Sequence, residues 1–105
     1  MKATLGHTAV RVQDITGMVA LLEDLLGWTV SRTMGEGPAN VWFEEGLQLV
    51  HDPAFEGPEG RLHHLGVAVP DRAAMSAECA RRGYKEVRPN WYALPDGLVI
   101  EFLQG

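Results

Sequence analysis

The chain contains an approximate internal repeat, and this repeat limits the folds that the chain can adopt. The segment HTAVRVQD begins at His7, and the similar segment HLGVAVPD begins at His64, 57 residues later. Each segment leads into a stretch with helical spacing of apolar residues that stops at a glycine, Gly27 or Gly83. A repeat this long with only two copies does not fit a solenoid, so we predict a duplicated module.

The first half predicts the order βαβββ. The alternating, β-branched stretch 4–12 predicts a strand. Asp14 is a good N-cap and Gly27 suits the residue that ends a helix, so a helix is expected between them. The remaining expected elements are a strand over 28–34 and a hairpin of 39–44 with 47–51 that turns at Glu45-Gly46.

The second half predicts the same order. A strand is expected over 62–69, and a helix from the N-cap Asp71 to Gly83. The remaining expected elements are a strand over 84–88 and a hairpin of 91–94 with 98–103 that turns at Pro95-Asp96-Gly97. The prediction is therefore an α+β fold in one domain, 1–105, with module one at 1–52, a linker at 53–60 and module two at 61–105.

Composition agrees with a single globular domain. The chain has 105 residues, 46% hydrophobic and 22% charged. A formal net charge of −5 provides no basic surface for phosphates, so nucleic acid is not expected as a partner. No apolar run is long enough to cross a bilayer, and the first residues lack the apolar run of a signal peptide. With Cys79 alone no internal disulfide can form, and we expect a cytoplasmic protein without a membrane partner.

Polar side chains interrupt the apolar strands at matching positions. His7 and His64 begin the two repeated segments and lie on the strand face opposite the apolar residues that should meet the helices. Glu101 lies between apolar neighbours in the last strand, and Gln48 does the same in the first half. A buried charge needs a partner or a metal. Two imidazoles, a carboxylate and an amide oxygen suit one divalent metal ion.

The motifs HTAVRVQD, HHLGVAVPD and PDGLVIEF resemble the vicinal oxygen chelate superfamily over essentially the whole chain. That superfamily includes glyoxalase I, methylmalonyl-CoA epimerase, extradiol dioxygenases, and fosfomycin- and bleomycin-resistance proteins. The resemblance implies a glyoxalase-like fold, in which two βαβββ modules form a U-shaped mixed sheet around a central cavity. It also implies metal ligands on the first and last strands of each module, which here are His7, Gln48, His64 and Glu101.

Three further residues are candidates for substrate binding. Arg11 shares the face of His7, where it would bind an anionic substrate group or form a salt bridge at the rim. If Glu45-Gly46 is a two-residue turn, Phe43 lies opposite Gln48, and by similar reasoning Tyr92 lies opposite Glu101. A register change of one residue would reverse both assignments. The three tryptophans are interpreted as core residues.

The resemblance implies an enzyme with one divalent metal ion (Ni, Co, Zn, Mn or Fe), a small-molecule substrate and a homodimeric assembly. The first hypothesis is a glyoxalase- or epimerase-like isomerase or lyase that acts on a small vicinal-oxygen substrate through a metal-stabilised enolate, with Glu101 moving the proton. The second is a non-heme iron oxygenase of the extradiol type, because two histidines and one carboxylate match its ligands. The third is a drug- or metabolite-binding protein of the bleomycin-resistance type without turnover.

Overall fold

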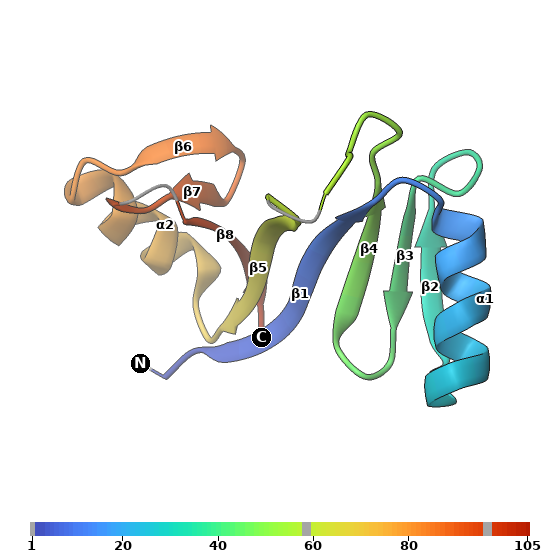
Figure 1. Cartoon of the computed structure of the whole chain (residues 1–105). Coiled ribbons are helices and arrows are strands. Elements are labelled where there is room, and N and C mark those ends of the chain that lie inside the picture. Colours follow the sequence, from blue (N-terminus) through green and yellow to red (C-terminus); the bar gives the residue numbers. More distant parts are fainter. Residues whose placement is uncertain (1, 58–59, 96–97) are drawn as a thin grey trace. The chain divides into compact units, whose positions relative to one another are not determined.

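The computed structural model describes residues 2–57, 60–95 and 98–105. Within these residues the helices and strands follow the order βαβββ twice, as predicted. The elements are β1 (Thr4–Val12), α1 (Ile15–Leu26), β2 (Val30–Met34), β3 (Asn40–Phe43), β4 (Leu47–His51), β5 (Leu62–Val69), α2 (Arg72–Arg81), β6 (Lys85–Arg88), β7 (Trp91–Ala93) and β8 (Val99–Gln104). The predicted α+β class with a duplicated module is confirmed (Figure 1).

The chain forms two compact units, and their boundary passes through β1 and β5. The N-terminal unit is Thr8–His63, and the C-terminal unit combines Met1–His7 with His64–Gly105. The start of β1, including His7, therefore belongs with the second module. No helix in the described part of the chain is long and apolar enough to cross a membrane.

The N-terminal unit packs α1 against a mixed sheet with the strand order β2-β3-β4-β1, in which β1 and β4 are parallel. The predicted caps of α1 are confirmed. The Asp14 side chain accepts a hydrogen bond of 3.0 Å from the Gly17 amide, and Gly27 ends the helix with a φ of 67°. Buried apolar side chains from α1 and the strands form the core of this unit: Val12, Ile15, Val41, Phe43 and Leu49.

The C-terminal unit repeats this arrangement with α2 and the strand order β5-β8-β7-β6. Asp71 caps α2 by accepting a hydrogen bond of 3.0 Å from the Ala74 amide. The core of this unit consists of Val69, Cys79, Tyr92 and Phe102. Figure 1 shows each helix beside the strands of its own module.

The register of both hairpins differs from the prediction by one residue. In the first hairpin Trp42, not Phe43, pairs with Gln48, because three residues rather than two separate β3 from β4. The Gly46 amide donates to the Phe43 carbonyl across this turn, at 3.1 Å. The predicted strand over 28–34 also begins later, at Val30, because Trp28 packs against the core instead.

In the second hairpin Trp91, not Tyr92, pairs with Glu101. Tyr92 pairs with Ile100. Asp96 and Gly97 of the predicted turn lie outside the described residues, and so do Pro58 and Glu59 of the predicted linker.

Candidate metal centre

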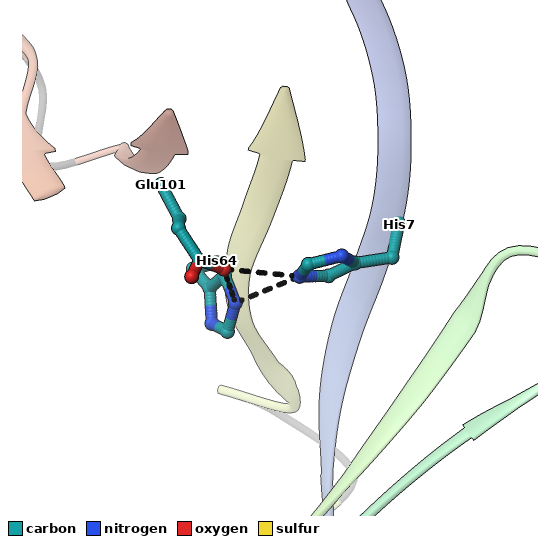
Figure 2. Close-up of side chains that lie close together, drawn as sticks. All are labelled: His7, His64 and Glu101. Carbon is teal, nitrogen blue, oxygen red and sulfur yellow. Dashed lines mark hydrogen bonds and ion pairs between the residues drawn. The ribbon is translucent and has the colours of Figure 1, made fainter. Parts of the chain in front are cut away.

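Three side chains of the C-terminal unit converge on one point, as Figure 2 shows. They are His7 from β1, His64 from β5 and Glu101 from β8. The Nε2 atoms of the two histidines lie 3.2 Å apart. Oε1 of Glu101 lies 3.2 Å from Nε2 of His7 and 3.3 Å from Nε2 of His64. Each of the three residues thus presents one possible ligand atom to a shared centre.

Sheet pairing explains why these residues meet. β5 and β8 run parallel, with Gly66 beside Glu101. His64 lies two residues before Gly66, so it projects from the same face of the sheet as Glu101. This face lies opposite the one that packs on α2, and we call it the site face. The site-face residues alternate along each strand with the apolar residues of the core.

Gly66 leaves room for the His7 ring. A Cβ atom added at position 66 would lie only 2.3 Å from Cε1 of His7. Contacts this short do not occur, so any larger residue here would displace the imidazole. A glycine at position 66 is thus a condition for the convergence of the three side chains.

The two histidines are shielded from solvent, and Glu101 is partly buried. His64 is 2% exposed and His7 is 8% exposed. Burial raises the pKa of Glu101, but the hydrogen bonds with His64 and His7 outweigh that effect and hold its pKa at about 2. Glu101 is therefore an ionised carboxylate at neutral pH, held against two imidazoles.

These residues fit a divalent metal ion. The candidate ligand atoms of His7, His64 and Glu101 all lie within 4.8 Å of one another. Imidazole nitrogens and a carboxylate oxygen are common ligands of zinc, nickel, cobalt, manganese and iron. Three such ligands leave further coordination positions for a substrate, as catalytic rather than structural sites do.

Gln48, the fourth predicted ligand, belongs to the N-terminal unit. Its side chain is buried, and its Nε2 donates to Oδ1 of Asn40 at 3.1 Å. Its Oε1 is buried without a hydrogen-bond partner among the described residues. An unpaired buried carbonyl oxygen is costly, and it is the atom that a metal would use. The role of Gln48 as a ligand stays a prediction.

The three predicted substrate-binding residues are engaged elsewhere. The guanidinium of Arg11 donates to the carbonyls of Gly60 and Leu62, at 2.6 and 2.9 Å. It also lies 3.6 Å from the Asp52 carboxylate, which matches the rim salt bridge rather than an anion site. Phe43 and Tyr92 lie in the two helix-side cores, because the hairpin registers were wrong.

Trp91 is the site residue that the sequence interpretation assigned to the core. It pairs with Glu101, so it shares the site face, and its ring centroid lies 4.2 Å from that of His64. The hydroxyl of Tyr92, by contrast, donates to Glu86 at 3.1 Å. Only the length of the turn distinguishes these two neighbours, and the sequence pattern did not fix it.

Comparisons with known proteins agree on the fold. No protein-family model matches the chain. The uncharacterized protein YwbC of Bacillus subtilis is 26% identical over 115 residues, which cover all of this chain and 91% of that protein. Methylmalonyl-CoA epimerase of Streptomyces coelicolor, in complex with 2-nitronate-propionyl-CoA, has a TM-score of 0.71 at 16% identity over 96% of each chain.

A variant of homoprotocatechuate 2,3-dioxygenase from B. fuscum, in complex with HPCA, has the same TM-score of 0.71 at 20% identity. The match covers 96% of this chain and 33% of the dioxygenase. Both enzymes are members of the vicinal oxygen chelate superfamily, so the predicted resemblance in fold is confirmed.

Proposed function

We propose that this chain, which has the vicinal oxygen chelate fold, is a metal-dependent isomerase or lyase for a small substrate with two neighbouring oxygen atoms. His7, His64 and Glu101 would hold one divalent metal ion, and Gln48 would supply a fourth ligand. The observation that carries the proposal is the convergence of two imidazoles and an ionised carboxylate within 4.8 Å. A partly buried carboxylate beside two buried imidazoles is costly unless a cation or protons neutralise its charge.

The bound metal would supply Lewis-acid stabilisation of negative charge on the substrate oxygens. Side chains of the site would carry out the proton transfer. Nε2 of both histidines lies within 3.3 Å of Oε1 of Glu101, so the carboxylate is already held where the metal would bind. Glu101 would accept a proton from the carbon beside the substrate carbonyl and return it. With a pKa of about 2 it is a weak base, so this role requires that both histidines give up their contacts with Glu101, as they would when their Nε2 atoms bind the metal.

The epimerase neighbour supports isomerase chemistry, because it has this fold over nearly its entire length. A second candidate is a non-heme iron oxygenase of the extradiol type. Two histidines and one carboxylate are the ligand set of such iron sites, and a dioxygenase is among the structural neighbours. The choice between the isomerase or lyase and the oxygenase depends on which metal binds and on whether Gln48 is one of its ligands.

Elemental analysis of the purified protein tests the proposal. We expect about one divalent ion per chain in the wild type and a loss of that ion in His64→Ala. His51→Ala is the matched control, because His51 is exposed at the end of β4. Equal metal in wild type and His64→Ala would refute the site. Gln48→Ala tests the fourth ligand, and we expect it to weaken metal binding on the order of 10-fold.

A substrate panel then separates the functional classes. Nickel, cobalt, zinc or manganese with turnover and no oxygen uptake supports the isomerase or lyase. Iron(II) with oxygen uptake supports the oxygenase instead. Failure to take up any metal, even after reconstitution, would contradict both and favour a metabolite- or drug-binding protein without turnover.

A further inference from the structure

A row of paired side chains crosses the site face of the C-terminal unit. Gly66 on β5 pairs with Glu101 on β8, Glu101 pairs with Trp91 on β7, and Trp91 pairs with Arg88 on β6. Residues paired in this way project from the same face of a sheet. Trp91 and Arg88 therefore extend the surface that begins with the candidate metal ligands.

Contacts within the row are close. The Trp91 ring lies 4.2 Å from the His64 ring between centroids, with a tilt of 47°. Cζ of Arg88, on the next strand of the sheet, lies 5.3 Å from the Trp91 ring centroid. The Trp91 indole thus lies close both to this guanidinium and to a candidate metal ligand.

A β-bulge turns Arg88 toward this face. Glu86 pairs with Tyr92 on the helix side, and without an irregularity Arg88, two residues later, would share that side. The register shifts between Glu86 and Arg88, so Val87 is the extra residue and Arg88 pairs with Trp91 instead. Bulges commonly redirect a side chain beside a functional site.

The guanidinium of Arg88 is available to a ligand. Among the described residues, no carboxylate forms an ion pair with it. The nearby Glu86 carboxylate is engaged by the Tyr92 hydroxyl and the Asn90 amide. An arginine stacked on an aromatic ring keeps the donors along its edge, which match a carboxylate or phosphate.

The N-terminal unit contains the same row. Ala9 pairs with Gln48, Gln48 with Trp42, and Trp42 with Arg32. Cζ of Arg32 lies 4.3 Å from the Trp42 ring centroid, and the register shifts just before this arginine as well. In each module the order is a small residue, a predicted ligand, tryptophan and arginine. The stacked pair thus accompanies the predicted ligand in both modules.

We propose that Trp91 and Arg88 form the specificity-determining part of the site. Arg88 binds a carboxylate or phosphate group of the substrate, and Trp91 packs against the segment that joins this group to the oxygens at His7, His64 and Glu101. The inference rests on the proposed function, since it takes these three residues as the other end of the substrate site. The substrate class is a small organic anion with two neighbouring oxygens at one end and a second anionic group about one aromatic ring away.

Three probes test this inference on protein loaded with Ni²⁺: benzoylformate, its 4-carboxy derivative and its 4-phosphonomethyl derivative. Their dissociation constants are measured by calorimetry for the wild type, Arg88→Gln and Arg81→Gln. Arg81 is the charge-matched control, because it lies on α2, where its side chain pairs with Glu78. The two anionic derivatives show whether a carboxylate or a phosphate is preferred.

We expect the wild type to bind at least one anionic derivative on the order of 10-fold more tightly than benzoylformate. Arg88→Gln should abolish this preference while the affinity for benzoylformate and the Ni²⁺ content stay unchanged, and Arg81→Gln should keep the preference. Three outcomes would overturn this inference and leave the proposed function intact. They are no preference in the wild type, a preference that survives in Arg88→Gln, or an equal loss of affinity for all three probes in Arg88→Gln. If the wild type takes up no Ni²⁺, the assay is repeated with Co²⁺, Zn²⁺, Mn²⁺ and Fe²⁺, and failure with all five metals would overturn the proposed function and this inference with it.

Discussion

At the residue scale, Gly66 controls whether His7 can reach the other two ligands. Gly66→Ala should destabilise the protein by about 1–3 kcal/mol, because the new Cβ would lie 2.3 Å from the His7 ring. In a His7→Ala background the ring is gone, so the same substitution should cost much less. Chemical denaturation of the wild type, the two single variants and the double variant measures this difference. An equal cost in both backgrounds would show that the His7 ring is not what Gly66 accommodates.

Glu101 provides a pH test at the same scale. Its pKa is held at about 2, below the ordinary value, so the carboxylate is ionised at all higher pH values and loses its charge only as the pH falls toward 2. Glu101→Gln should therefore weaken metal binding by on the order of 100-fold, and by the same factor from about pH 5 to 8. Competition with a chromogenic chelator at several pH values measures the factor. A factor that shrinks steadily toward pH 5 would mean that Glu101 titrates in this range.

At the element scale, the sequence predicted most of the elements but not how the hairpins align. The strand 4–12 and the caps Asp14 and Gly27 follow from local patterns, and the structure has them where they were expected. The hairpin registers depend on turn length, and the first hairpin has a turn of three residues where two were predicted. A shift of one residue in the second hairpin likewise places Trp91 instead of Tyr92 on the site face, and for this reason the sequence pattern did not reveal the aromatic part of the site.

The cap of α1 is a second feature at this scale. Asp14→Ala removes the acceptor of the Gly17 amide and should lower the free energy of unfolding by about 1 kcal/mol. Asp24→Ala is the matched control, since it removes an acid from the C-terminal end of the same helix and should leave stability equal or slightly higher. Urea denaturation compares the two variants. Equal losses would mean that the effect comes from the general loss of an aspartate rather than from the cap.

At the scale of the whole molecule, one of the two compact units is built from two separate segments of the chain. The convergence of His7, His64 and Glu101 follows from a duplication that the sequence makes visible, since the two histidines are 57 residues apart. What the sequence pattern could not indicate is that the first residues of β1 join the second module in one unit. The three candidate ligands therefore come from segments that are distant in sequence, and a bound metal would cross-link them.

This cross-link gives a prediction for global stability. A ligand present at about 100 times its dissociation constant stabilises the folded state by about 2.7 kcal/mol, which for a chain of this size raises Tm by roughly 10 °C. We expect this rise between chelator-treated and Ni²⁺-saturated wild type in thermal unfolding. His64→Ala should show little rise, because it has lost one of the three ligands. His51→Ala, exposed on β4, should behave like the wild type. If His64→Ala gained as much as the wild type, the stabilising ion would bind somewhere other than this cluster.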